Sequence, residues 1–221
     1  MRTTPLASLI TLSLALAAGP ALAQQNIDKV FGGITAESGQ EYGSLESVNG
    51  GITVREGATV RAAETVNGGI SIADRARVGS AETVNGGINL GDAATAGSLE
   101  TVNGGIRGRK GVQVGGNAET VNGGLNFDGA KIAGSLTTTN GDITLDATHV
   151  RGGILVEKPS SGWWNSGNSR KPRIVIGPDS VVDGALVFER EVELFVHASA
   201  RIGKVTGATA RAYTDKLPPR E

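Results

Sequence analysis

Aliphatic residues return at every sixth position over a long stretch of this chain. Within each step apolar and polar residues alternate, as in Ile52-Thr53-Val54, which is typical of a short strand with one buried side. Pairs of glycine follow at regular intervals and would interrupt a helix. We therefore predict strands of one six-residue unit each, with every sixth aliphatic residue directed toward a common axis: Val48, Val54, Val60, Val66, Ile72, Val78, Val84, Leu90, Ala96 and Val102.

A longer repeat is superimposed on this step. The motif Ser/Thr-Val-Asn-Gly-Gly-Ile/Leu occurs five times, and a looser sixth copy follows. The successive asparagines are 18, 18, 18, 19 and 18 residues apart, so one residue is inserted near Gly111 to Gly116. Three six-residue strands thus complete one turn. The predicted fold class is all-β, a single-stranded parallel β-helix (β-solenoid) with triangular coils of about 18 residues, and roughly nine coils would span about 40 Å.

The asparagines and glycines of the motif are expected to form one corner of each coil. Both residue types adopt positive φ at low cost, which suits a turn. Asparagines at the same corner of successive coils can also hydrogen-bond through their side-chain amides. We therefore predict a structural ladder of Asn49, Asn67, Asn85, Asn103, Asn122 and Asn140. Near the two ends, Phe31, Phe188 and Phe195 are expected to act as caps against further stacking.

The N-terminal residues carry the pattern of a secretory signal peptide. Arg2 supplies a positive start, residues 6–18 form a short apolar run, and Ala21-Leu22-Ala23 is a small-residue cleavage site. We expect cleavage after Ala23, no membrane span after cleavage, and a location in the periplasm, outside the cell or at its surface. The predicted organisation is residues 1–23 as signal peptide, 24–213 as the β-solenoid domain with a loop insertion at 157–172, and 214–221 as a polar tail.

Composition restricts the function classes. The 38% of hydrophobic residues argues against a disordered chain, and the 4% of aromatic residues favours a narrow core. With a net charge of −1, the chain has no overall electrostatic attraction for nucleic acid or for an anionic membrane, so we expect no nucleic-acid partner. With no cysteine, stability depends on packing and backbone pairing alone.

The sequence offers little material for catalysis. It contains two histidines, His149 and His197, without the spacing of a metal site, and it has no nucleophile elbow or phosphate-binding loop. We therefore predict that the protein is not an enzyme and has no catalytic residue, metal site or cofactor. His149 is the one candidate for a general base.

An irregular segment at 157–172 interrupts the repeat and contains both tryptophans. Adjacent aromatic rings with nearby cations can bind a sugar or a protein surface. This makes Trp163, Trp164, Lys158, Arg170 and Lys171 candidate binding residues. The alternative is that one ring covers an exposed face of the rod.

Two resemblances follow from these motifs. The Asn-Gly-Gly-Ile units, over about residues 30–156, resemble the bacterial adhesin-type solenoid domains of the "head GIN" kind, which implies a β-solenoid fold. The hexads at 176–184 and 196–204 are similar to the hexapeptide β-helices of acyltransferases and to bactofilin-like polymer-forming β-helices.

Three hypotheses on function remain open. The first is a non-catalytic exported cell-envelope protein, whose rigid solenoid is a binding, adhesion or structural surface for an envelope protein or a glycan. The second is a self-assembling bactofilin-like protein whose edge strands pair end to end. The third is an exported carbohydrate-active β-helix enzyme. The oligomeric state is open in all three.

Overall fold

The computed structural model of the chain describes residues 25–159 and 170–219. These residues form strands β1 to β25 and no helix, and the strands pair in parallel as a β-solenoid of about 10 turns. The predicted all-β solenoid with coils of about 18 residues is therefore confirmed, with one turn more than the roughly nine expected. The predicted signal peptide lies outside the described residues. Within them, no helix has the length and apolarity that crossing a bilayer requires.

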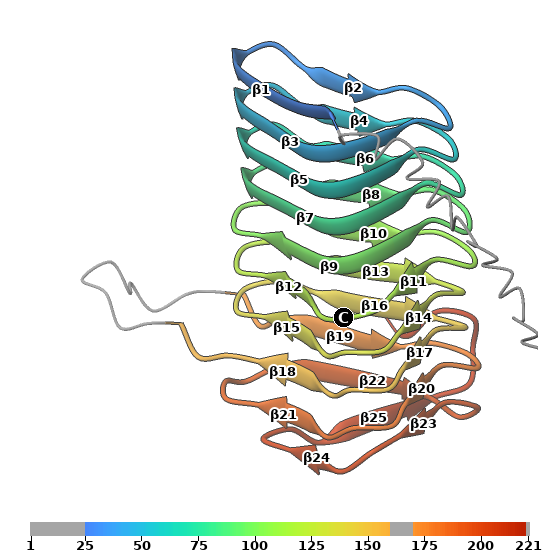
Figure 1. Cartoon of the computed structure of the whole chain (residues 1–221). Coiled ribbons are helices and arrows are strands. Elements are labelled where there is room, and N and C mark those ends of the chain that lie inside the picture. The colour runs from blue at the N-terminus through green and yellow to red at the C-terminus, as the bar shows by residue number, and fades with distance from the viewer. Residues whose placement is uncertain (1–24, 160–169, 220–221) are drawn as a thin grey trace, which may run out of the picture.

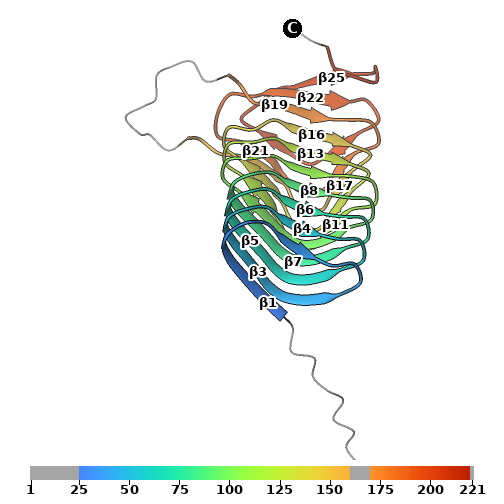
Figure 2. The ribbon, with the colours of Figure 1, turned by 90° about the horizontal axis from the view of Figure 1, so that it is seen from above.

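The first face of the triangular rod is a ten-stranded sheet to which each coil contributes one strand. Neighbouring coils are paired in register, as in Ile52↔Ile70 and Ile70↔Ile88. Figures 1 and 2 show these strands stacked along the rod. They are β2 (Ile34–Ala36), β4 (Ile52–Val54), β6 (Ile70–Ile72), β8 (Ile88–Leu90), β10 (Ile106–Gly108), β13 (Leu125–Asp128), β16 (Ile143–Asp146), β19 (Arg173–Ile176), β22 (Glu193–His197) and β25 (Ala210–Tyr213).

The other two faces belong to one sheet of fifteen strands. In the N-terminal half, long strands bend around the corner between these faces. They are β3 (Glu41–Asn49), β5 (Thr59–Asn67), β7 (Arg77–Asn85) and β9 (Thr95–Thr101), and β1 (Gln25–Phe31) pairs with the first of them. Later coils have two strands instead. The second face continues with β11 (Gln113–Val114), β14 (Lys131–Ile132), β17 (His149–Val150), β20 (Val181–Val182) and β23 (Arg201–Ile202). The third continues with β12 (Ala118–Thr120), β15 (Leu136–Thr138), β18 (Ile154–Val156), β21 (Leu186–Phe188) and β24 (Val205–Thr206).

The inserted residue explains the change from one bent strand to two. Val114 pairs with Ala96, and Ala118 pairs with Leu99. Three residues of the later coil therefore lie opposite two residues of the earlier coil. The extra residue interrupts the backbone pairing at this corner, as a β-bulge does. The insertion expected near Gly111 to Gly116 thus falls at the corner after β11.

The core receives six side chains from each regular coil. In one coil the first face supplies Ile52 and Val54, the second Ala58 and Val60, and the third Ala63 and Thr65, all buried. The step from the second face to the third is therefore five residues instead of six.

The prediction that every sixth aliphatic residue faces the axis is wrong on this third face. Val48, Val66 and Val84 point outward and are 42%, 41% and 40% exposed. The step at this corner is one residue shorter than six. The alternation of inward and outward side chains therefore shifts by one position, and the residue before each valine points inward. The buried column is Ser47, Thr65, Thr83, Thr101, Thr120 and Thr138.

The hydroxyl groups in this column donate hydrogen bonds to backbone carbonyls. Thr65 Oγ1 donates to the carbonyl of Gly50 at 2.8 Å, and Thr83 Oγ1 donates to that of Gly68 at 2.8 Å. A valine side chain in the same place would leave a partly buried carbonyl without this partner, which is unfavourable. This bond gives a physical reason for threonine inside and valine outside.

The explanation of the glycine pairs by positive φ is also wrong. Positive φ is found at other corners, for example at Gly57 and Arg75, and not at the asparagines or glycines of the Asn-Gly-Gly motifs. The first glycine of each pair is needed because the backbones of successive coils approach closely. A Cβ atom on Gly86 would overlap the carbonyl of Gly68 in the preceding coil.

The ends of the rod differ from the predicted caps. Phe31 is 78% exposed on the outside of the first coil, so it covers no core. Phe188 is an ordinary core residue of β21. Phe195 lies outside the first face, where it packs with Val175 and Tyr213. The Arg173 guanidinium lies 4.5 Å from the centre of the Phe195 ring and donates to the carbonyl of Pro219, so the polar tail lies against this face.

The substitution Gly86→Ala tests the close approach of the coils. It should lower the free energy of unfolding by more than about 3 kcal/mol, because the new methyl group meets backbone and not a movable side chain. Gly57→Ala is the matched control, since that site has open space and only a positive φ, which costs about 1 kcal/mol. Chemical denaturation measures both. Equal losses would contradict this account of the motif.

Candidate functional site

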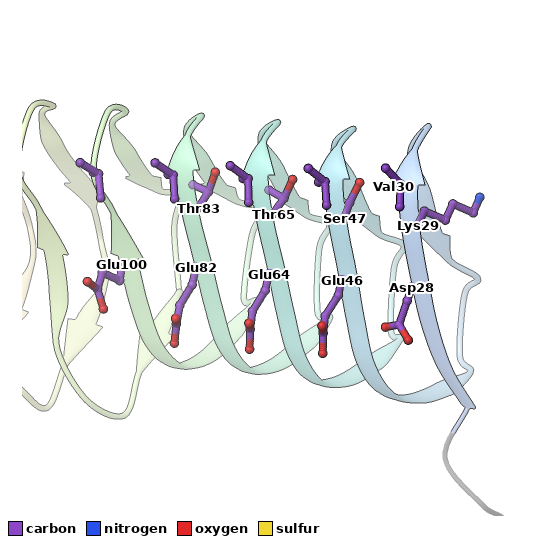
Figure 3. Close-up of a pocket in the computed structure, with 14 residues that line it drawn as sticks. Asp28, Lys29, Val30, Glu46, Ser47, Glu64, Thr65, Glu82, Thr83 and Glu100 are labelled. Atoms are coloured by element: carbon purple, nitrogen blue, oxygen red, sulfur yellow. The ribbon is translucent and has the colours of Figure 1, made fainter.

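Two outward columns run side by side along the third face of the N-terminal half. One column is acidic and consists of Asp28, Glu46, Glu64, Glu82, Glu100 and Glu119. The other is apolar and consists of Val30, Val48, Val66, Val84, Val102 and Val121. Figure 3 shows the carboxylates of neighbouring coils projecting from the same side of the sheet.

Local folding explains this arrangement. In each coil the acid and the valine are two residues apart on one strand, so both point outward, with the inward Ser or Thr between them. Glu64 pairs with Glu46 and with Glu82 in register, so each carboxylate follows the last by one strand spacing of about 4.8 Å.

Five members of each column, from Asp28 to Glu100 and from Val30 to Val102, line a groove of about 470 Å³ that crosses β1, β3, β5, β7 and β9. We call it the acid–valine groove, and it is hydrophobic along one side and negatively charged along the other.

Lys29 is the one cation among the residues that line the acid–valine groove, and its Nζ donates to the carbonyl of Gly33 at 2.9 Å. Among the described residues, no Lys or Arg forms an ion pair with these six carboxylates, whereas acids elsewhere on the rod are paired, as in Arg55–Glu37 at 3.0 Å. Burial raises the pKa of Glu82, and repulsion from Glu64 and Glu100 raises it further. A raised carboxyl pKa means that the folded state binds protons more readily than the unfolded state. This contribution to stability is therefore present below the ordinary value of 4.5 and is lost as the pH rises through the raised pKa.

Sequence reasoning missed the acid–valine groove. The repeated Glu-Ser/Thr-Val triplet at 18-residue spacing was the available signal. The six-residue step placed the valines inside the rod, and this assignment concealed the outward column beside the acids.

The asparagine column forms a side-chain ladder on the adjacent corner. Each Nδ2 donates to the Oδ1 of the asparagine one coil earlier, at 2.8 to 3.0 Å, from Asn140 back to Asn49. At its last rung, Asn140 Oδ1 accepts a hydrogen bond from Arg190 Nη1 at 2.6 Å. Arg190 also donates to the carbonyl of Thr139 at 3.1 Å. Sequence reasoning had no signal for Arg190, which is 50 residues from its partner.

The candidate binding residues of the loop lie at its two ends or outside the described residues. Arg170 pairs with Asp142 at 2.6 Å, and Lys171 pairs with Glu191 at 2.8 Å. The backbone N–H of Lys158 donates to Glu189. These contacts tie the loop ends to neighbouring coils. Trp163 and Trp164 lie outside the described residues.

The histidines lie on separate surfaces. His149 Nε2 is 2.7 Å from Asp183 Oδ2 on the second face, beside a hollow of about 410 Å³ that Lys131 and Arg151 also line. His197 Nδ1 is 2.8 Å from Ser199 Oγ. Among residues 25–159 and 170–219, no group of three or more His, Cys, Asp or Glu side chains is arranged to hold a metal ion.

A mid-ladder substitution tests the asparagine column. Asn85→Ala removes one donated and one accepted hydrogen bond and should lower the free energy of unfolding by about 1 kcal/mol. Asn89→Ala is the matched control, because Asn89 belongs to the outward side of the first face and to no ladder; its effect should stay under about 0.5 kcal/mol. Denaturant titration of both variants compares them, and an unchanged Asn85 variant would contradict a stabilising ladder.

Comparison of the chain with protein-family models, with curated proteins and with solved structures finds no match. The resemblance to adhesin-type solenoid domains thus rests on the repeated motif alone, and what the structure establishes is the β-solenoid fold.

Proposed function

We propose that this protein is a non-catalytic exported protein of the cell envelope, whose rigid solenoid binds a partner through the acid–valine groove. The observation that carries the proposal is the pair of in-register columns, exposed valines beside unneutralised carboxylates, over successive coils. Since each coil is hydrogen-bonded to its neighbours, the columns keep their spacing without a partner. Such preorganisation favours binding.

The fold itself does not require these residue types. On the first face the outward residues of the first four coils are neutral and polar, Thr35, Thr53, Ser71 and Asn89, and the next in this column is the cation Arg107. Stacked carboxylates repel one another, and exposed valines leave apolar surface in water. Neutral polar residues would satisfy the sheet equally well. A binding role accounts for this departure, because a partner would neutralise the acids and cover the valines.

Export is the second component of the proposal. It is supported by the basic start, the apolar run and the small-residue site before Gln24. The motif-level resemblance to adhesin-type domains agrees with a surface or periplasmic role. The partner would be an envelope protein or a glycan.

Expression of the full-length chain with a C-terminal tag tests both components. The exported form should begin at Gln24, as measured by mass spectrometry of periplasm and medium. Crosslinking in the envelope should capture a partner, and Val66→Thr with Val84→Thr should reduce its yield about tenfold, equivalent to losing modest apolar contacts at two coils. Threonine keeps the β-branched shape that suits a strand.

The control is the pair Ser71→Thr and Asn89→Thr on the first face, which should capture the partner normally. An uncleaved chain retained in the cytoplasm would refute export. Equal capture by the valine variants and the wild type would refute the role of the acid–valine groove.

A second candidate is end-to-end self-assembly, and the open first coil favours it. β1 pairs with β3 alone and β2 with β4 alone, so each has one edge without a described strand. Val30 and Phe31 on β1 are 60% and 78% exposed. Unprotected strand edges with apolar side chains favour pairing with another chain.

Sedimentation velocity of the purified protein tests this assembly. Under this candidate, the wild type should form larger species as concentration rises, and Val30→Asp with Phe31→Asp should remain monomeric. Leu217→Asp is the control, because Leu217 is an equally exposed apolar residue in the C-terminal tail. A wild-type monomer that is independent of concentration would eliminate the candidate.

A further inference from the structure

We propose that the ligand of the acid–valine groove is a basic amphipathic α-helix of a partner protein, which lies along the rod axis. This inference rests on the proposed function and names the class of partner. It follows from the charge, the apolar column, the backbone pairing of the groove floor and the length of the groove.

Charge selects a cationic partner. Six carboxylates stand in one column without an ion pair among the described residues, on a chain whose net charge is only −1. A partner with Lys or Arg side chains at intervals would give each carboxylate a counter-charge. The same side chains would remove the repulsion between Glu64, Glu82 and Glu100.

The valine column indicates that the ligand also has an apolar surface and is not purely ionic. Its exposed side chains run parallel to the acids, and the two columns are two strand residues apart, which is about 7 Å. A matching ligand therefore needs an apolar stripe beside a basic stripe. Successive residues of a helix are rotated by about 100° around its axis, so a basic stripe and an apolar stripe can run side by side along one helix.

Backbone pairing distinguishes a helix from an extended peptide. The strands of the groove floor are hydrogen-bonded to the coils on both sides, as β5 is to β3 and β7. They have no free edge within the groove to which another strand could add. An extended peptide lying across them would leave its own N–H and C=O groups without partners there. A helix satisfies its backbone internally and contacts the groove through side chains alone.

The length of the groove and the spacing of its acids also fit a helix. The five acids that line the groove, at about 4.8 Å per coil, span about 19 Å, which is the length of a helix of about thirteen residues. One helical turn rises about 5.4 Å, so basic residues on successive turns stay near successive carboxylates within the reach of long side chains. Same-side residues of an extended chain are about 6.8 Å apart and lose this match within a few coils.

The test uses the purified protein and a fluorescent helical peptide of eighteen residues. The peptide carries Lys at i, i+4, i+7, i+11 and i+14, an adjacent stripe of Leu, and Ala elsewhere. A scrambled peptide of the same composition is the control. Fluorescence anisotropy should show at least about tenfold tighter binding of the patterned peptide, because only that peptide contacts both columns.

Two sets of variants assign the binding to the acid–valine groove. Glu64→Gln with Glu82→Gln, and separately Val66→Thr with Val84→Thr, should each weaken binding about tenfold, as expected for two lost contacts of modest strength. Glu41→Gln is the control for charge, since Glu41 lies on β3, which also carries Glu46 of the groove, but around the corner on the second face. The glutamine pair should also be more stable than the wild type at pH 7, which excludes unfolding as the reason for weaker binding.

The outcomes separate this inference from the proposed function. Equal affinities for patterned and scrambled peptides, or binding that neither pair of variants weakens, would overturn the helical partner. If envelope capture still depends on Val66 and Val84, the acid–valine groove keeps its proposed role with a ligand of another class. If capture is also insensitive, both proposals fail.

Discussion

Parallel pairing of each coil with the next, in register, is the constraint on which the rest of this structure depends. Because the repeat is 18 residues, a residue type placed once is placed again one strand spacing away. Each column therefore brings identical side chains close together, so that their mutual attraction or repulsion recurs at every coil. Asparagine suits this arrangement because its amide both donates and accepts, whereas glutamate does not, because identical charges are brought together. A residue type is therefore favourable at a given position only if its side chain tolerates contact with the same side chain in the neighbouring coils.

Much of the fold could be predicted from sequence because the repeat and the coil share one length. The first two faces follow the six-residue step, so residues such as Ile52, Val54 and Val60 occupy the core as expected. On the third face the step fails, because the backbone turns one residue earlier. Thr65 and Val66 are then the competing inward residues, and hydrophobicity alone favours valine. The deciding factor is the carbonyl of Gly50, a partner visible only when the coils are stacked.

The candidate site was missed for the same reason. A surface made of columns exists only when the direction of every side chain is known, and an error of one residue exchanges inside and outside. The regular hexads of the C-terminal coils illustrate the contrast, since Ile176 and Val182 follow the six-residue step and are buried, as is Phe188 six residues further on. The coils with the five-residue step expose Val48, Val66 and Val84, and Val121 stays exposed in the coil where the inserted residue restores a six-residue step from Val114 to Thr120. What the exposed valines share is the motif itself, in which an inward Ser or Thr stands between an outward acid and an outward valine.

The asparagine ladder gives the rod a direction. Every rung donates toward the N-terminal end, so the amide dipoles add along the axis, and no single rung can reverse without leaving two neighbours mismatched. The guanidinium of Arg190 lies at the acceptor end, where a positive charge is favoured. The two ends of the ladder are consequently chemically unlike. At one end Asn49 pairs with Phe31 of β1, whose side chain offers its Nδ2 no acceptor, and at the other end the ladder stops at a cation, so neither end can add a further asparagine rung.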